Sequence, residues 1–464
     1  MTRLATCVVV FVGGCSLSND IDVCEGEGPP AEVGVTMVPT GFQASGPGAV
    51  GEIPGRGAFV VFPSIESNGL QVQSFLRASV FQIDGQRRPP CPRIGILQSP
   101  PYAALEGVNT FVFASVSGPE SASMSSLGLI VAVQAETDAA GVFVESKLVG
   151  TSFDGDGCPQ TMINGGGGSL IDLDETSVEN QVVGPPAVLR IANNRYVVGW
   201  VSGTVGSASF RSRLKARIVE TNRSAQPTLG PIVEIERGLI AGMAMTRVED
   251  RVAFAWEQVA FPDSFVALEL RDLDLQPVEG LDRQVLEFRA DGAEIEDTRI
   301  ALGYDGNQML AAWVRRVDGQ ATRISARFRG PDGEPFVSVD SLDGLPFQPS
   351  TGEAAEELNP TIASLPGGGL VLAWEEHGLT TGGAADRVQA LVFDAVGQRR
   401  FLNQACGPGP VTLSMTSDLP VQEPSIAFLG EAGLVGAWSA TDRPRNLSEV
   451  RVRTFPASEL FPVR

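Results

Sequence analysis

Carboxylates recur between the apolar runs of this chain, and paired carboxylates can act as proton donor and base when a glycosidic bond is cleaved. They precede four of the apolar runs: Asp172, Asp174, Glu175 and Glu179; Asp291, Glu294, Glu296 and Asp297; Glu353, Glu356 and Glu357; Asp418 and Glu423. Glu375 and Glu376 directly follow Trp374, and His377 comes next. The same side chains could instead form a negative surface that receives a cation or a basic partner.

His377 is the only histidine of the chain, which excludes a HExxH zinc site and restricts a Ser-His-Asp triad to this one residue. Neither a GxSxG nor a GxxxxGK[ST] motif accompanies it. The plain interpretation is a solvated loop histidine. The alternative interpretation is a hydrolase or lyase site that combines His377 with carboxylates such as Glu356 and Glu375.

The run Asp154-Gly155-Asp156-Gly157 resembles a fragment of a calcium-binding loop. A complete loop needs about six oxygen ligands at defined spacing. The following residues, 158–160, supply no carboxylate. We therefore expect a turn here, with calcium as the weaker alternative, and no other cofactor or metal.

These side chains must be positioned by a repeating unit that is marked by tryptophan. All five tryptophans follow a short apolar run and a Gly or Ala: Trp200, Trp256, Trp313, Trp374 and Trp438. The clearest unit reads PTIASL, a turn, LVLAWEE, a loop and VQALVFDAVG. Short apolar runs bounded by Pro and Gly indicate strands, and repeats of 40 to 60 residues with strand content indicate a β-propeller.

Two degenerate units precede these five, with Phe62 and then Ser115 at the tryptophan position. The sequence thus predicts an all-β fold: a seven-bladed β-propeller over residues 31–464 with four-stranded antiparallel blades. The blades should centre near residues 62, 115, 200, 256, 313, 374 and 438, with an insertion at about 145–180. An apolar run at 32–38 should complete the last blade and close the ring. We expect the tryptophans to pack between blades, with a sugar-stacking platform as the alternative.

The unit P-x-[IV]-A-x-L, LVLAW, V-x-A-x-x-F-D-x-x-G resembles a repeat of exported bacterial proteins. That resemblance implies a seven-bladed propeller among mostly uncharacterised surface or lipid-anchored proteins, and it carries over no catalytic residue. No Asp-box of the sialidases occurs in any unit. In a propeller the acidic segments should share one face, where Glu353, Glu356, Glu357, Glu375 and Glu376 would converge.

The first residues predict export. Arg3 is followed by about ten apolar residues, too few to span a bilayer, so residues 1–14 are interpreted as a signal peptide. Val12-Gly13-Gly14-Cys15 resembles the bacterial lipobox, which implies lipidation of Cys15 and a linker over residues 15–30. We expect an outer-membrane or surface lipoprotein that meets the membrane only through its lipid, with ordinary secretion as the alternative.

Four further cysteines remain once Cys7 is removed with the signal and Cys15 is lipidated. An even number in an exported chain suggests two disulfides. The repeat favours the pairs Cys91–Cys158 and Cys24–Cys406.

The net charge of −21 argues against nucleic acid and anionic membranes as partners. The main functional expectation is a non-enzymatic propeller of the cell envelope whose acidic face binds a protein, a glycan or a cation. The alternatives are a carboxylate-dependent glycan hydrolase or lyase, and a passive scaffold.

Overall fold

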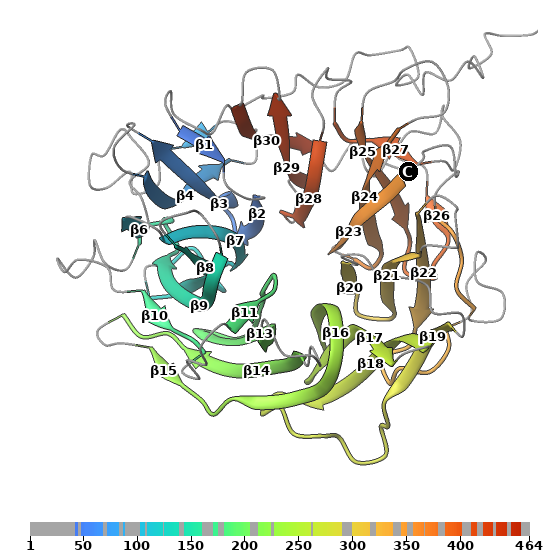
Figure 1. The fold of residues 1–464 in the computed structure, drawn as a ribbon. Coiled ribbons are helices and arrows are strands. Elements are labelled where there is room, and N and C mark those ends of the chain that lie inside the picture. The colour runs from blue at the N-terminus through green and yellow to red at the C-terminus, as the bar shows by residue number, and fades with distance from the viewer. Residues whose placement is uncertain are drawn as a thin grey trace, which may run out of the picture.

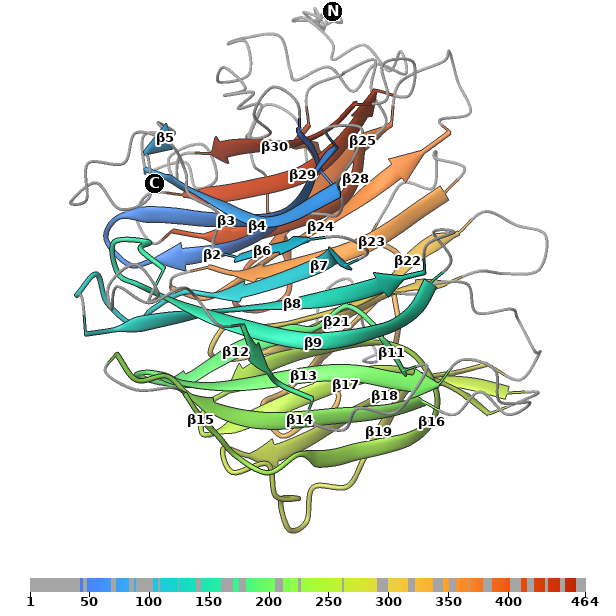
Figure 2. The ribbon, with the colours of Figure 1, turned by 60° about the vertical axis from the view of Figure 1, so that its left-hand side comes forward.

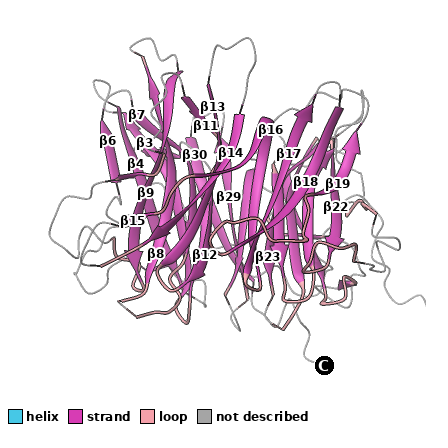
Figure 3. Cartoon of the chain, turned by 90° about the horizontal axis from the view of Figure 1, so that it is seen from below, coloured by secondary structure: helices cyan, strands magenta, loops and turns pink. Residues whose placement is uncertain are grey.

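The computed structural model describes about two thirds of the chain, and every element in that part is a β-strand (Figure 3). The described residues are 42–44, 48–67, 72–82, 87–88, 103–106, 109–123, 125–138, 143–159, 170–174, 181–204, 212–223, 227–260, 263–289, 299–315, 322–336, 345–349, 356–365, 367–378, 386–400, 410–414, 421–429, 433–442 and 447–455. This part of the chain contains no helix of the length and apolarity needed to cross a membrane.

The described strands pair antiparallel in groups, which we call blades 1 to 7 in chain order. Blade 1 holds β1 (Phe42–Ala44), β2 (Ala49–Ile53), β3 (Gly57–Ser67), β4 (Val72–Phe81), β5 (Arg87–Arg88) and β6 (Ala103–Glu106). Blade 2 holds β7 (Asn109–Ser117), β8 (Leu127–Thr137), β9 (Phe143–Asp154) and β10 (Ile171–Asp172). Blade 3 holds β11 (Gln181–Val183), β12 (Ala187–Ala192), β13 (Arg195–Thr204), β14 (Ser212–Glu220) and β15 (Thr228–Leu229).

The strands of the remaining blades are also given in chain order. Blade 4 holds β16 (Val233–Val248), β17 (Arg251–Ala260), β18 (Asp263–Asp272) and β19 (Gln284–Arg289). Blade 5 holds β20 (Ile300–Tyr304), β21 (Met309–Arg315) and β22 (Arg323–Arg329). Blade 6 holds β23 (Glu356–Ser364), β24 (Leu370–His377), β25 (Arg387–Phe393), β26 (Arg399–Arg400) and β27 (Val411–Thr412), and blade 7 holds β28 (Val421–Phe428), β29 (Leu434–Asp442) and β30 (Leu447–Phe455). The long β16 also pairs with β14, which joins blades 3 and 4 into one nine-stranded sheet.

The blades stand around a common axis, and one strand of each blade lies nearest to it (Figures 1 and 2). These inner strands contact one another in sequence, from β2 through β7, β12, β16, β20, β23 and β28 and back to β2. Apolar side chains fill the spaces between the blades rather than a single central core. The all-β propeller predicted from the sequence is therefore confirmed.

Blades 1 and 7 close the ring by direct packing. Val50 and Phe62 of blade 1 share a buried cluster with Val435 and Val450 of blade 7. The backbone N–H of Val50 also donates to Oγ of Ser425 at 3.1 Å. The strand that we expected at 32–38 lies outside the described residues, so its part in closing the ring stays a prediction.

The tryptophans are structural, as expected. Each is at most 1% exposed and packs against the blade that precedes it. The small residue before each ring allows this close packing. A Cβ on Gly199 would lie 2.6 Å from Cε of Met243 in the next blade, so a larger residue here would require this flexible side chain to move.

Blade 2 differs from the sequence-based assignment. Ser115 lies in the inner strand, β7, whereas each tryptophan lies in the strand that pairs with the inner strand of its blade. Ala132 of β8 takes that position. Trp256 pairs with Ala267, which stands five residues before the turn at Asp272. Ala132 pairs in the same way with Val149, which stands five residues before the turn at Asp154. The expected insertion at 145–180 is also wrong at its start, since residues 145–154 belong to β9.

Candidate functional site

The inner strands are irregular at one common level, next to the tryptophans. Register shifts interrupt β7 between Phe111 and Phe113, β23 between Leu358 and Thr361, and β28 between Gln422 and Ser425. A bulge turns side chains out of the regular alternation and bends the strand. The inner strands of blades 2, 6 and 7 therefore each carry a bulge near the axis, at the same end of the ring.

Two of these bulges hold a non-glycine residue in the left-handed region. Asn359 has φ of 50° and Glu423 has φ of 54°, and each directly precedes a proline, Pro360 or Pro424. Residues other than glycine rarely adopt this backbone conformation, although Asn does so more readily than Glu. A following proline further restricts the backbone and favours an extended conformation in the residue before it. Backbone strain of this kind gathers at functional sites, where the surrounding structure holds it in place.

Glu375, the residue after Trp374, lies between the two bulges and is hydrogen-bonded by both. Its Oε1 accepts from Nδ2 of Asn359 at 2.8 Å, and its Oε2 accepts from the backbone N–H of Glu423. His377 contacts Oε1 as well, with Nε2 at 3.1 Å. The Glu375 side chain is only 2% exposed. It therefore joins blades 6 and 7 and fixes the place of Glu423.

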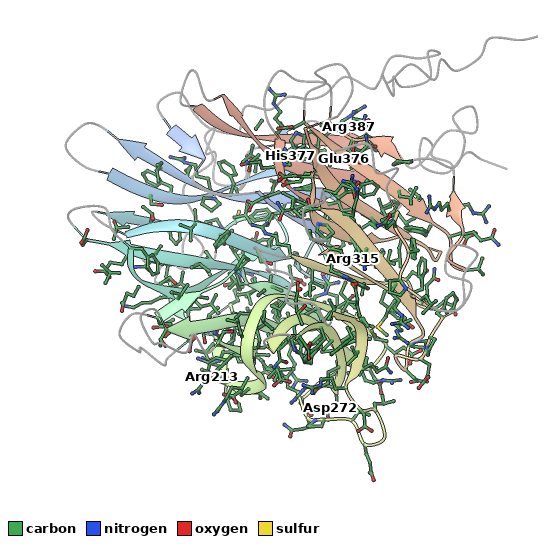
Figure 4. The ribbon with its side chains drawn as sticks, turned by 45° about the vertical axis from the view of Figure 1, so that its right-hand side comes forward. Arg213, Asp272, Arg315, Glu376, His377 and Arg387 are labelled. Atoms are coloured by element: carbon green, nitrogen blue, oxygen red, sulfur yellow. The ribbon has the colours of Figure 1, made fainter. Side chains whose placement is uncertain are left out.

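His377 is held between two carboxylates. Its Nδ1 lies 3.0 Å from Oδ2 of Asp386, on the side of the ring opposite Glu375. Burial alone would lower the pKa of His377, but the hydrogen bonds to Glu375 and Asp386 outweigh it and raise this pKa to about 9. The imidazole is thus positively charged at neutral pH. The expectation of a solvated loop histidine is wrong, because His377 ends strand β24 and is half-buried (Figure 4).

Glu423 is the more accessible carboxyl of the cluster, with 24% of its side chain exposed. Its Oε1 accepts from Nη2 of Arg299, which directly precedes β20 in blade 5. Burial raises the pKa of the Glu423 carboxyl above its usual value; Arg299 opposes this shift and the charge of Glu375 adds to it. A carboxyl whose pKa is raised stays protonated to higher pH and can donate that proton.

The guanidinium of Arg299 also reaches blade 2. Its central carbon lies 5.8 Å from the centroid of the Phe113 ring, in the bulge of β7. Blades 5 and 2 are not neighbours, because β20 contacts β16 and β23 whereas β7 contacts β2 and β12. Arg299 therefore crosses the axis. We call Asn359, Glu375, His377, Asp386, Glu423, Arg299 and Phe113 the axial cluster.

Of the other predicted acidic residues, those that the structure describes have no side-chain contact with this cluster among the described interactions. Oε1 of Glu376 accepts from Trp374, and its Oε2 lies 2.8 Å from Nε of Arg387 (Figure 4). Glu357 is fully buried and accepts from the backbone N–H of Ile324 in blade 5 at 2.9 Å. Glu356 is exposed at the start of β23. Glu353, Asp291, Glu294, Glu296 and Asp297 lie outside the described residues.

The calcium-like run is a turn that the repeat uses several times. Oδ1 of Asp154 accepts from the backbone N–H groups of Asp156 and Cys158, each at 2.9 Å. Asp272 and Asp394 bind the second and fourth residues after them in the same way. The described residues contain no group of three or more His, Cys, Asp or Glu side chains that could hold a metal ion. The aspartate at this position of the repeat therefore stabilises a turn.

Of the four cysteines that we expected to pair, the structure describes Cys158, which is disulfide-bonded. Cys24, Cys91 and Cys406 lie outside the described residues, as does Cys15. The pairs Cys91–Cys158 and Cys24–Cys406 stay predictions.

No model of a known family matches the sequence, and no curated protein matches it. Several solved structures are similar in fold. A GH93 α-L-arabinofuranosidase of Fusarium graminearum in complex with arabinobiose has a TM-score of 0.40 and 10% identity over 75% of this chain and 94% of its own. An α-L-arabinanase of Penicillium chrysogenum has a TM-score of 0.34 and 10% identity over 58% of this chain and 92% of its own. An endo-arabinase of Bacteroides thetaiotaomicron has a TM-score of 0.30 and 13% identity over 58% and 93%.

The main functional expectation, a non-enzymatic acidic binding surface, is corrected here. The similar structures are glycan-cleaving enzymes rather than binding proteins, and the likeness extends to the fold alone. Glu357, Glu375 and Glu376 are buried and hydrogen-bonded, so these three do not contribute to an exposed acidic surface. Similarity this low assigns neither a residue nor a substrate, so both must be argued from the axial cluster itself.

Sequence reasoning found Glu375 and His377 but missed Asn359, Asp386, Arg299 and Phe113 as parts of the site. It placed Glu423 in an acidic segment without singling it out. A signal was present for two of these residues. Asn359 and Glu423 each stand three residues before the first-strand isoleucine of their unit and directly before a proline.

Proposed function

We propose that this chain is a glycan hydrolase that uses carboxyl groups of the axial cluster. The observation that carries the proposal is Glu423: a partly exposed carboxyl on a strained bulge next to the axis, with a raised pKa. A carboxyl with these properties suits the proton donor that every hydrolysis of a glycosidic bond needs.

In the reaction that we propose, Glu423 donates its proton to the glycosidic oxygen as the bond from this oxygen to the anomeric carbon breaks. A water molecule attacks the anomeric carbon and gives one proton to a second carboxylate. The products are two shortened glycans, one of which has a new reducing end. The proton returns from the second carboxylate to Glu423 through solvent, which restores the site.

Asp386 is the proposed second carboxylate, since 22% of its side chain is exposed and Glu375 is almost fully buried. Glu375 is a positioning residue. Its two oxygens accept three hydrogen bonds, and the one from the backbone N–H of Glu423 holds that backbone in place. His377 neutralises part of the charge of Glu375 and Asp386 and keeps them apart.

The test is the release of reducing ends from a panel of plant and bacterial polysaccharides that includes arabinan. The wild-type protein is compared with Glu423→Gln and with a matched control, Glu279→Gln, in an exposed loop of blade 4. We expect Glu423→Gln to lower kcat at least a hundredfold and Glu279→Gln to leave it unchanged. Equal activity of the wild type and Glu423→Gln, or no cleavage of any member of the panel, would contradict the proposal. Products with a double bond in the sugar ring would mean elimination instead of hydrolysis.

A further inference from the structure

Arg299 stands out among the charged groups of the axial cluster because it is the most exposed of them, at 30% of its side chain. Its partners in the cluster are the Glu423 carboxylate and the face of Phe113. The other cation, His377, has a carboxylate on each of its ring nitrogens. Arg299 is therefore the cation of this cluster that can exchange its partner for a ligand.

The exchange follows from the reaction proposed above, on which this inference rests. When Glu423 carries the proton that it donates, it no longer supplies a negative charge to Arg299. The charged groups of the cluster are then Glu375, Asp386, His377 and Arg299, whose charges sum to zero although the whole chain has a net charge of −21. Arg299 is the most exposed of these four groups.

We propose that Arg299 binds the carboxylate of a uronic acid residue and that the substrate is an acidic glycan. A guanidinium presents planar, paired N–H donors that match a carboxylate better than they match the hydroxyl groups of a neutral sugar. The ring of Phe113 lies beside the guanidinium of Arg299 and helps to hold it in place through a cation–π contact. Arg299 and Phe113 together form this subsite.

The ion pair between Arg299 and Glu423 has a second consequence, which concerns the pH dependence of substrate binding. As pH rises and Glu423 ionises, its carboxylate competes with the substrate for Arg299. The KM for the acidic glycan should therefore rise over the pH range in which Glu423 loses its proton, while the KM for a neutral glycan should not change. A purely structural role of Arg299 would not produce this difference.

The experiment compares acidic polysaccharides (homogalacturonan, alginate and glucuronoxylan) with their carboxyl-reduced forms, which have the same linkages without the charge. Neutral arabinan and galactan are included. We expect at least one acidic polymer to be cleaved with a kcat/KM at least tenfold above its reduced form. Arg299→Gln should remove this preference, and Arg299→Lys should keep part of it. The two variants are first compared by thermal unfolding, and Arg299→Lys stays informative if Arg299→Gln unfolds.

Binding gives a readout that does not need turnover. Oligomers of galacturonate, guluronate and glucuronoxylan are titrated by calorimetry into Glu423→Gln, which cannot cleave them and leaves Arg299 without its carboxylate. We expect one of the three to bind Glu423→Gln more tightly than it binds the double variant Glu423→Gln/Arg299→Gln, by tenfold or more.

The outcomes separate this inference from the proposed function. If a neutral glycan is cleaved, Glu423→Gln abolishes that cleavage, and acidic polymers are untouched or no better than their reduced forms, the inference is overturned and the hydrolase stands. If no polymer is cleaved faster by the wild type than by Glu423→Gln, the hydrolase fails and the substrate assignment fails with it.

Discussion

Nε2 of His377 lies 3.1 Å from Oε1 of Glu375, two residues earlier on the same strand, and this contact ties the stability of the site to pH. The pKa of His377 is raised to about 9 in the folded chain, against about 6.5 for an unperturbed histidine. A raised folded pKa contributes stability that is complete below about pH 6.5 and is lost as pH rises through about 9.

The expected size follows from the shift. The difference in the free energy of unfolding between the wild type and His377→Gln should be roughly 2–3 kcal/mol larger at pH 6 than at pH 10. Urea titrations at a series of pH values measure this difference, with Glu279→Gln as a control that should show no trend. A difference that is constant across the range would mean that folding does not raise the pKa of His377.

The fold could be predicted from the sequence because successive repeats pack in the same way. Trp256 and Trp313 occupy the same place against the preceding blade, and one unit predicts the next. Blade 2 was misaligned because Ala132 stands where the tryptophan would have marked the register. The axial cluster was not predicted for a different reason. Its residues come from blades 2, 5, 6 and 7, and no local sequence pattern connects them. Bulges change which of these side chains point to the axis, and only the bulges at Asn359 and Glu423 are marked in the sequence, by the proline that follows each.

Two tryptophans of the repeat should differ in what their indole N–H contributes. Nε1 of Trp374 donates to Oε1 of Glu376 at 3.0 Å, whereas Nε1 of Trp438 has no hydrogen-bond partner among the described residues. Replacement by Phe removes a hydrogen bond in the first case and a buried, unsatisfied donor in the second. Trp374→Phe should therefore destabilise the chain by about 1–2 kcal/mol more than Trp438→Phe. Equal midpoints in urea unfolding would contradict the assignment of the Trp374 hydrogen bond.

The turn at Asp154 should be indifferent to calcium. Both of its backbone contacts use Oδ1, which closes the turn without an ion. Millimolar Ca²⁺ or EDTA should leave the thermal unfolding midpoint unchanged, and Asp154→Ala should lower stability by about 1–2 kcal/mol through the lost turn contacts. Asp272→Ala, at the same position of blade 4, is the matched comparison and should cost a similar amount. A rise of several degrees with Ca²⁺ that Asp154→Ala removes would show a metal site instead.

The strongest structural prediction concerns Ser414, which occupies in blade 6 the position that Asp174 occupies in blade 2, where blade 3 packs against blade 2. There, Nη1 of Arg217 donates to the carbonyl of Leu173 at 2.8 Å, and the next residue, Asp174, accepts from Nε1 of Trp200 at 2.9 Å. Lys215, paired with Trp200 across the strands, lies 3.2 Å from the same carboxylate. One acidic side chain thus satisfies the indole and the ammonium between two blades.

Blade 7 packs against blade 6 in the same way as blade 3 packs against blade 2, except that Ser414 replaces the acidic residue, Asp174. Nη1 of Arg453 donates to the carbonyl of Leu413 at 2.7 Å, and Arg451 pairs with Trp438 across the strands as Lys215 pairs with Trp200. Ser414 follows Leu413, and its Oγ accepts from the backbone N–H of Val388 at 2.9 Å, a bond that an Asp oxygen can keep. Ser414→Asp should therefore give Trp438 its acceptor next to the positive charge of Arg451.

We expect Ser414→Asp to stabilise the chain by about 1 kcal/mol, the worth of one added hydrogen bond to a charged partner. The reverse change, Asp174→Ser, should destabilise it by about 3 kcal/mol, because it leaves Lys215 buried without its carboxylate. The double variant Ser414→Asp/Trp438→Phe separates the two contributions, since the gain should vanish once the indole N–H is gone. A loss of stability in Ser414→Asp that Trp438→Phe does not change would mean that burial of the new charge outweighs the hydrogen bond, and that the two interfaces are not equivalent.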